Sequence, residues 1–437
     1  MDSLFHAIDT LRFPRELPAT LLEVKQTFDA VRVADVEAAT VAALEDSGML
    51  ARITPGQSVA VGVGSRGITN IARITKATVA RLQAHGAQPF VVAAMGSHGG
   101  ANADGQRDML ASLGVTEQSV GCELRITMDV RQIGQLPDGP PLYMDEFSAA
   151  ADHSILLSRI KPHTDFRGAL ESGPSKMAVI GFGKQKGAQA MHAYGGNGFR
   201  NYLAAAARIY EANTNFLGAV CILENAYDET GVIAGLSAAQ VGTEAEVKLQ
   251  AQSKTMMASI PFDDLDVLVV RRMGKNISGA GMDPNVLKRL LVPREPEPQG
   301  GPAVIVTLDL TDETHGNCAG LGLANIITKR LLQKIDFYAF YMNGVTSGTF
   351  GVYRGAMPLV MGDDQRALEV ASHMCGVPQP ANVRMALVRD TLTVDRMWVS
   401  PALRREVEAH PRLSIERETP LTFGADGAML SPWKIAG

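Results

Sequence analysis

Cysteine is scarce and scattered in this sequence. The 437 residues include four cysteines, none of them in the C-x-x-C spacing of a thiolate metal site, at Cys122, Cys221, Cys318 and Cys375. Neither a disulfide framework nor a cysteine zinc site is therefore indicated, and the four side chains are expected to be small buried hydrophobes. A cytoplasmic location, where thiols stay reduced, fits this usage best.

Long apolar runs and an excess of positive charge are also missing. No segment approaches the roughly 20 apolar residues that span a bilayer, and the start, M-D-S-L-F-H-A-I-D-T-L-R, lacks the basic and apolar regions of a signal peptide. The formal net charge is −5, and no basic block carries interleaved aromatics. Membrane and nucleic-acid partners are therefore not expected. The 46% hydrophobic content suffices for two or more domains with full cores.

Strands, glycine-rich loops and helices alternate in the first part of the chain. The β-branched run 58–63 leads into G-S-R-G, the run 89–95 leads into G-S-H-G-G, and a helical pattern follows each loop. This order is typical of an α/β domain with a parallel sheet. Because ligands of such sheets bind beyond the carboxyl ends of the strands, Arg66 and His98 are expected on the same rim.

A second alternation follows residues 225–258, a polar and alanine-rich stretch that is expected to connect two domains. The predicted fold is α/β, with mostly parallel sheets in an N-terminal domain, 1–260, and a C-terminal domain, 261–437, and with the active site in the cleft between them. The expected strands are residues 58–63, 89–95, 123–128, 154–157, 217–223, 266–271, 303–308 and 383–388. The expected helices are residues 31–50, 71–85, 104–113, 199–212, 363–375 and 401–410, with one more ending near Lys334.

Histidine, lysine, arginine and glycine are concentrated in residues 158–196. His163 follows an expected strand and, with His98 on the same rim, is a candidate general base because imidazole titrates near neutral pH. Lys176 is a candidate nucleophile if nearby cations lower its pKa, although most lysines in such a segment are solvated. His192 is a candidate metal ligand, and a packed helix residue is the alternative.

The loop G-S-R-G at residues 64–67 has two open interpretations. Its guanidinium and free backbone N–H groups suit a phosphate or a carboxylate, but a tight turn with a solvated arginine explains the pattern equally well. The glycine spacing matches neither a P-loop nor a Rossmann fingerprint. A nucleotide site of either type is therefore not predicted.

Five short motifs, V-G-S-R-G, G-S-H-G-G, K-P-H, G-P-S-K and M-H-A-Y-G, occur in this order within residues 58–196. Their order and separations resemble the nickel-pincer nucleotide lactate racemase family. The resemblance implies that His98 and His163 are the catalytic acid/bases, that Lys176 binds the cofactor covalently and that His192 ligates nickel. The interval from Lys176 to His192 agrees with the family's. The phosphate of the mononucleotide would be held by Gly64, Ser65 and Arg66.

The resemblance implies an isomerase that racemises or epimerises a 2-hydroxy acid. One histidine would take the α-hydroxyl proton while hydride moves to the pincer ring, and hydride would return on the other face. Val63, Gly67 and Gly99 replace an acid, a proline and an arginine of the family, which predicts an acid other than lactate. Expected partners are this small acid, the proteins that synthesise the cofactor and, as an open alternative, a second copy of the chain. Candidates for holding carboxylates are Arg159, Lys161, Arg167 and Lys275.

Two other classes of protein stay open from the residues alone. A zinc hydrolase or lyase would use His98, His163 and His192 as three ligands, although no H-E-x-x-H motif supports it. A nucleotide- or sugar-phosphate-binding protein without catalysis would use only the glycine-rich loops, and it leaves Lys176 and His192 without a role.

Overall fold

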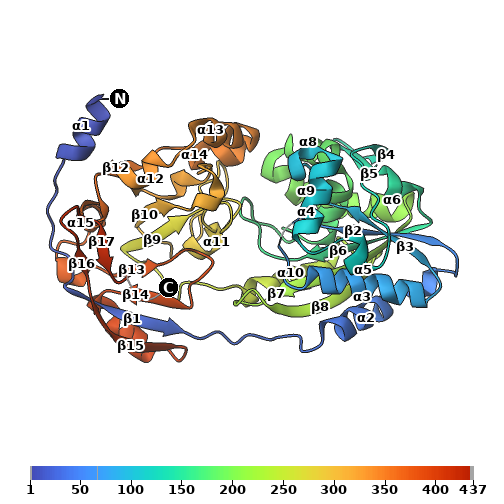
Figure 1. The fold of residues 1–437 in the computed structure, drawn as a ribbon, viewed down its shortest axis with the longest axis horizontal. Coiled ribbons are helices and arrows are strands. Elements are labelled where there is room, and N and C mark those ends of the chain that lie inside the picture. The colour runs from blue at the N-terminus through green and yellow to red at the C-terminus, as the bar shows by residue number, and fades with distance from the viewer. Residues whose placement is uncertain (1, 66, 434–437) are drawn as a thin grey trace. The chain divides into compact units, whose positions relative to one another are not determined.

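The chain folds into two compact α/β units in a computed structural model that describes residues 2–65 and 67–433 (Figure 1). Unit 2 is Ala30–Met257, and unit 1 combines Met1–Asp29 with Ala258–Gly437. Each unit contains one large sheet in which most neighbouring strands are parallel. The predicted fold class, α/β with mostly parallel sheets, is confirmed.

Unit 2 contains a five-stranded sheet in the order β3-β2-β6-β7-β8, and only β8 runs antiparallel to its neighbour. The four parallel strands are short apolar runs of the sequence, and their buried residues cover both faces. A separate hairpin, β4-β5, follows the region where a strand at 123–128 was expected; that region makes only one isolated bridge to β3. The strands are β2 (Ser58–Val63), β3 (Gln88–Ala93), β4 (Val130–Gln135), β5 (Pro141–Asp145), β6 (His153–Arg159), β7 (Phe216–Glu224) and β8 (Thr230–Ser237).

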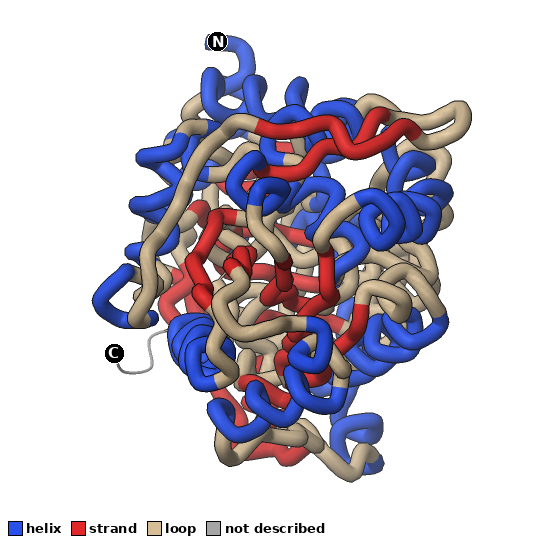
Figure 2. Tube along the Cα trace, turned by 90° about the vertical axis from the view of Figure 1, so that its right-hand side faces the viewer, coloured by secondary structure: helices blue, strands red, loops and turns tan. Residues whose placement is uncertain are grey.

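Helices cover both faces of this sheet, as Figure 2 also shows in blue around the red strands. Alternate residues of each strand point to opposite faces, so Val61 packs with α2, α3 and α4, whereas Leu156 packs with α8, α9 and the π-helical segment Met177–Phe182. The helices are α2 (Val36–Asp46), α3 (Ile71–Ala84), α4 (Ala103–Ser112), α5 (Glu117–Val120), α6 (Glu146–Ala150), α7 (Pro174–Lys176), α8 (Lys184–His192), α9 (Gly195–Asn213) and α10 (Glu244–Met256).

Unit 1 contains an eight-stranded sheet in the order β12-β11-β10-β9-β13-β14-β1-β15. The strands from β12 to β13 are parallel, and β14, β1 and β15 add antiparallel pairs. The strands are β1 (Thr20–Gln26), β9 (Val267–Met273), β10 (Val304–Leu310), β11 (Ile326–Thr328), β12 (Leu359–Met361), β13 (Met385–Val388), β14 (Arg396–Val399), β15 (Leu413–Pro420), β16 (Thr422–Phe423) and β17 (Met429–Ser431). The helices are α1 (Asp2–Thr10), α11 (Pro284–Leu287), α12 (Lys329–Gln333), α13 (Phe337–Thr346), α14 (Gly351–Arg354), α15 (Asp364–Met374) and α16 (Arg404–Ala409).

The N-terminal 29 residues correct the expected domain boundaries of 1–260 and 261–437. They belong to unit 1, because β1 lies between β14 and β15 and pairs with both. The buried carboxylate of Glu23 on β1 also accepts from Arg396 at 2.6 Å and from Arg417 at 2.7 Å, which ties it to both neighbours. Short-range sequence patterns do not reveal a pairing between segments so far apart.

Residues 225–258 also differ from the prediction. They form β8 and α10 of unit 2 rather than a connection between domains, and β8 closes one edge of the sheet. The expected helix at 31–50 is shorter, because α2 begins after its N-cap Asp35, whose side chain accepts from Ala38 N–H.

Candidate active site

The loops after β2 and β3 bring Ser65 and His98 together. Ser65 Oγ hydrogen-bonds His98 Nδ1, and the His98 side chain is exposed. Gly64, one residue earlier, packs against the residue that follows Lys176, since a Cβ at Gly64 would lie 3.5 Å from Met177 Cε. Arg66, the remaining residue expected in this loop, lies outside the described residues. The predicted rim position of His98 therefore adjoins the Lys176 segment.

Gly99 explains one departure from the family pattern. Its φ is +66°, and a Cβ there would lie 2.5 Å from the carbonyl carbon of Gly105. No side chain fits at that separation without moving the backbone of α4. The loop of His98 therefore closes on α4 more tightly than an arginine at position 99 would allow.

A buried ion pair is connected to the loop that carries His98. Lys184 Nζ lies 3.2 Å from Asp145 Oδ2, and both side chains are fully buried. Lys184 also donates to Gln106 Oε1 at 3.1 Å, and Gln106 Nε2 donates to the carbonyls of Gly96 at 2.9 Å and His98 at 3.2 Å. The first residue of α8 is thus linked to the backbone of His98. Lys184 is committed to this buried network.

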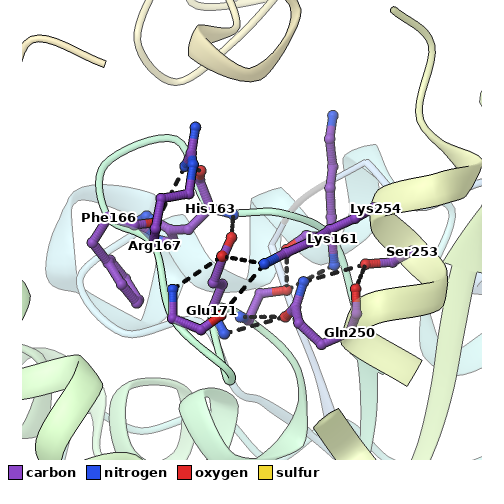
Figure 3. A network of polar contacts seen from close by, with 10 residues as sticks. Lys161, His163, Phe166, Arg167, Glu171, Gln250, Ser253 and Lys254 are labelled. Carbon is purple, nitrogen blue, oxygen red and sulfur yellow. Dashed lines mark hydrogen bonds and ion pairs between the residues drawn. The ribbon is translucent and has the colours of Figure 1, made fainter. Parts of the chain in front are cut away.

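Glu171 organises the loop of His163, as Figure 3 shows. This fully buried carboxylate accepts from His163 N–H at 2.9 Å and from Gly168 N–H at 3.1 Å, and it pairs with Lys254 Nζ at 2.6 Å. Gln250 on α10 accepts from Glu171 N–H at 3.2 Å. The K-P-H loop is therefore held by charge-assisted hydrogen bonds to a single carboxylate.

The side chain of His163 is mostly buried and has a defined set of neighbours. Its Nδ1 accepts from Asp165 N–H at 3.0 Å, and the Asp165 carboxylate lies 3.9 Å from the same nitrogen. Its ring also packs against Phe166, with centroids 4.5 Å apart. Because Nδ1 is an acceptor, the proton of the neutral ring is on Nε2.

Ser175 and Glu246 fix the turn that carries Lys176. Glu246 is buried, and it accepts from Ser175 N–H at 3.1 Å, from Ser175 Oγ at 2.8 Å and from Gly242 N–H at 2.7 Å. Burial raises the pKa of Glu246. α10 therefore supplies a carboxyl group that positions the residue before Lys176.

Phe199, near the start of α9, lies among three predicted site residues. Its ring centroid is 6.4 Å from that of His163 and 5.0 Å from that of His192, and Lys176 Nζ lies 5.6 Å from the same centroid. Phe199 is buried and stacks on Phe166 with centroids 5.2 Å apart. The structure thus gathers His163, Lys176 and His192 around one aromatic ring, although 29 positions separate the two histidines in the sequence.

His192 ends α8 and keeps an exposed side-chain surface. The surrounding protein and the nearby charge of Lys176 lower its pKa, and Asp165 opposes this only partly. A neutral imidazole is the form that binds a metal ion, so the local charges favour the ligand-competent state.

The predicted carboxylate-binding residues have different surroundings. Arg159 pairs with Glu224 at 2.8 Å and donates to the Gly67 carbonyl at 3.1 Å, so it joins the ends of β6 and β7. Arg167 donates to the carbonyl of His163 at 2.6 Å. Lys161 is in the same loop, where its backbone N–H donates to Ser172 Oγ at 2.7 Å. Lys275 is in unit 1 and donates to the Gly279 carbonyl at 2.6 Å.

Sequence reasoning missed the residues that hold these loops: Phe199, Glu171, Glu246, Gln106 and the Lys184–Asp145 pair. Glu171 and Lys184 are within residues 158–196, but the sequence does not show that they are buried, and without that knowledge they look like solvated charges. Glu246, Gln106 and Asp145 come from distant segments, and no local sequence pattern marks them as parts of the site.

The arrangement does not form a protein-only metal site in the part of the chain that the structure describes, where no three His, Cys, Asp or Glu side chains gather suitably. The three-histidine zinc site considered from the sequence therefore has no support from the geometry. None of the helices described in residues 2–65 and 67–433 is long and apolar enough to cross a membrane.

The fold and the site define an α/β protein with a histidine–lysine site on glycine-rich loops beyond parallel strands. Residues 13–197 match the family model of the lactate racemase N-terminal domain. This part of the chain therefore matches the family that its motifs resemble, and the resemblance of the motifs is confirmed. The match begins in the segment that supplies β1 to unit 1 and ends just before Phe199.

Solved structures with a related course of the chain are more distant. The lactate racemase apoprotein from Thermoanaerobacterium thermosaccharolyticum is 11% identical, with a TM-score of 0.43, over 66% of this chain and 74% of that one. A protein from Thermotoga maritima is 12% identical, with a TM-score of 0.45, over 73% of this chain and 80% of that one. None of the curated proteins matches the sequence.

Proposed function

We propose that this protein is a racemase or epimerase of a 2-hydroxy acid that works with a nickel-pincer nucleotide. The observation that carries the proposal is the convergence of His163, Lys176 and His192 around Phe199. The lactate racemase domain over residues 13–197 supports an isomerase of this general kind. The nickel cofactor and the 2-hydroxy acid are proposals that rest on the site residues.

The residues present fit such a cofactor. Lys176 would attach it through the side-chain amine, and His192, whose pKa is lowered, would offer a neutral imidazole to nickel. Gly64 and Ser65 would place backbone N–H groups near its phosphate. When bound, the group would supply a reversible hydride acceptor, which no side chain can provide.

His98 and His163 would exchange the proton of the substrate hydroxyl. If His98 Nδ1 donates to Ser65 Oγ, Nε2 is the acceptor nitrogen of the neutral ring, as a general base requires. His163 Nδ1 accepts from Asp165 N–H, so the neutral ring carries its proton on Nε2; as general acid the ring would be the imidazolium, with Nδ1–H facing the Asp165 carboxylate instead and Nε2–H given up to the substrate oxygen. The Asp165 carboxylate, 3.9 Å from Nδ1, would stabilise the imidazolium form. The two histidines would exchange these roles for the opposite enantiomer.

Phe166 and Phe199 would form an apolar wall beside the reacting carbon. Both rings are buried and stacked, so they would exclude water from one side of the site. Exclusion of water protects a transferred hydride from side reactions. Glu171 would keep the His163 backbone in place while the ring exchanges a proton.

The test is racemisation of single enantiomers of 2-hydroxy acids in D₂O by protein made in a host that synthesises the cofactor. Hydride return should leave the α-carbon unlabelled, whereas a proton abstraction from carbon would label it and refute the mechanism. His98→Asn and His163→Asn should each lower the rate about 100-fold or more. Rates within about twofold of wild type for either variant would remove that histidine from the site.

A further inference from the structure

Two arginines lie side by side at the carboxyl end of the unit 1 sheet. Val270 on β9 pairs with Val388 on β13, and Arg272 N–H donates to the Arg389 carbonyl at 3.1 Å. That hydrogen bond places Arg389 directly beside Arg271 on the neighbouring parallel strand. Residues opposite each other in a sheet project to the same face, so two guanidinium side chains begin at adjacent positions.

Like charges opposite each other in a sheet are unfavourable unless something compensates them. Arg271 and Arg389 are exposed, and partial desolvation first, then the charges of Arg272, Arg389 and Arg330, lower the pKa of Arg271, with Asp309 opposing them only in part. Within the described part of the chain, the side chains of Arg271 and Arg389 make no hydrogen bond and no ion pair. The pair is therefore a local excess of positive charge.

The nearby acids are already engaged by other cations. Asp390 pairs with Arg272 at 3.1 Å. Asp309 pairs with Arg330 at 3.3 Å and with Lys334 at 3.0 Å. Arg330 also binds Asp364 at 2.9 Å. Among residues 2–65 and 67–433, these pairings leave no carboxylate committed to Arg271 or Arg389.

Two indole N–H groups close to Arg271 also lack a hydrogen-bond acceptor in the described part of the chain. Arg271 lies over the ring of Trp433 at 5.4 Å, and Trp433 contacts Trp398 with ring centroids 4.9 Å apart. Trp398 pairs with Leu387 on β13, two positions before Arg389 and on the same face. Both indole nitrogens are buried, and neither has a hydrogen-bond acceptor among residues 2–65 and 67–433. A buried donor without an acceptor calls for an explanation such as an ion.

We propose that Arg271, Arg389 and Trp433 form a binding site for a small dianion, either a phosphate group or a dicarboxylate. The two guanidinium groups would each give a pair of N–H donors to the anion oxygens. The indole of Trp433 would form an apolar wall and add one N–H donor. The site lies near the carboxyl ends of β9 and β13, with Arg271 in the C-terminal part of β9 and Arg389 directly after β13, and ligands of parallel sheets commonly bind at that edge. It is in unit 1, whereas the histidine–lysine site is in unit 2.

The experiment titrates the full-length protein with inorganic phosphate and, separately, with malonate at constant ionic strength. The chain's two tryptophans, Trp398 and Trp433, both adjoin the site, so their fluorescence reports occupancy, and calorimetry gives the dissociation constant. Saturable binding of either anion supports the site, and the tighter one identifies the chemical source. An equal response to chloride would mean an adventitious ion only and would overturn the proposal.

Single substitutions distinguish a specific anion site from a general effect of surface charge. Arg271→Gln and Arg389→Gln should each weaken binding about tenfold or more, as expected for loss of a charge-assisted hydrogen bond. Arg405→Gln removes the same charge from an exposed position on α16 and should change the constant less than about twofold. Equal weakening by all three would contradict the proposal.

Two further controls separate anion binding from correct folding and from cofactor loading. Arg271→Lys and Arg389→Lys keep the charge but lose the planar fork, and they should bind less tightly while unfolding like wild type. If the lysine variants bind as wild type does, the fork geometry is refuted. The titration needs no nickel cofactor, so its outcome is independent of the proposed racemase activity.

Discussion

The imidazole of His192 meets the ring of Phe199 edge-on, with centroids 5.0 Å apart and an interplanar angle of 69°. Lys176 Nζ lies near the same ring, so one buried aromatic positions both residues that would hold the cofactor. A phenylalanine in this place is part of the site geometry as well as of the core.

Replacing Phe199 by Leu should separate these two roles. The substitution should lower the free energy of unfolding by about 1 to 3 kcal/mol, as core substitutions commonly do, and it should also reduce the nickel retained per chain. Phe216→Leu is the matched control, since Phe216 is equally buried in unit 2 but packs on Phe182 and Tyr210. The Phe216→Leu protein should be destabilised by a similar amount, but it should retain as much nickel per chain as wild type. Equal nickel retention in both variants would show that Phe199 only fills the core.

The Lys184–Asp145 pair should be sensitive to the loss of one partner. Lys184→Met leaves the buried carboxylate uncompensated and should cost about 3 to 5 kcal/mol, measured by urea unfolding. Removing both charges in Lys184→Met with Asp145→Leu should restore most of this loss, because the desolvation penalty disappears with the second charge. Faster amide exchange in residues 96–106 should accompany the single variant, since Gln106 loses its link to Lys184. A loss below about 1 kcal/mol in the single variant would contradict this account.

His153 should contribute a pH-dependent part of stability. Burial and the charge of Arg52 lower its pKa below 6.5, so the unfolded chain binds its proton more tightly than the folded chain does. The contribution is complete above pH 6.5 and is lost as the pH falls through the folded pKa. Urea unfolding from pH 8 to pH 5 should therefore show a smaller decrease for His153→Gln than for wild type, by about 1.4 kcal/mol for each unit of pKa shift. Parallel curves for the two proteins would rule out this contribution.

The position of β1 predicts which part of the chain folds alone. Residues 30–257 contain the whole sheet of unit 2 and should give a cooperative unfolding transition when expressed separately. Residues 258–437 lack the strand between β14 and β15, so they should aggregate or unfold unless residues 1–29 are also present. A stably folded 258–437 fragment would show that β1 is dispensable.

Much of the fold and part of the site are readable from the sequence. The strands β2, β3, β6, β7, β9, β10 and β13 are continuous apolar runs bounded by glycine or polar residues, which is the local pattern of a buried parallel strand. β1, β14 and β15 are short strands or strands in which apolar and polar residues alternate. Because β1 near the N-terminus pairs with β14 and β15 near the C-terminus, no local sequence pattern identifies this part of the sheet. Motif spacing marks His163, Lys176 and His192 as candidate site residues. Their convergence on Phe199 depends on how α8 and α9 pack, which spacing does not contain.

The most direct measurement is the intact mass and nickel content of the wild-type chain and of Lys176→Ala, made in a host that synthesises the cofactor. The account predicts that wild type gains the mass of one covalently bound nucleotide and about one nickel, that Lys176→Ala gains neither, and that Lys186→Ala, a nearby exposed lysine, behaves as wild type. The same added mass on Lys176→Ala, or a wild-type chain with neither added mass nor nickel, would contradict it.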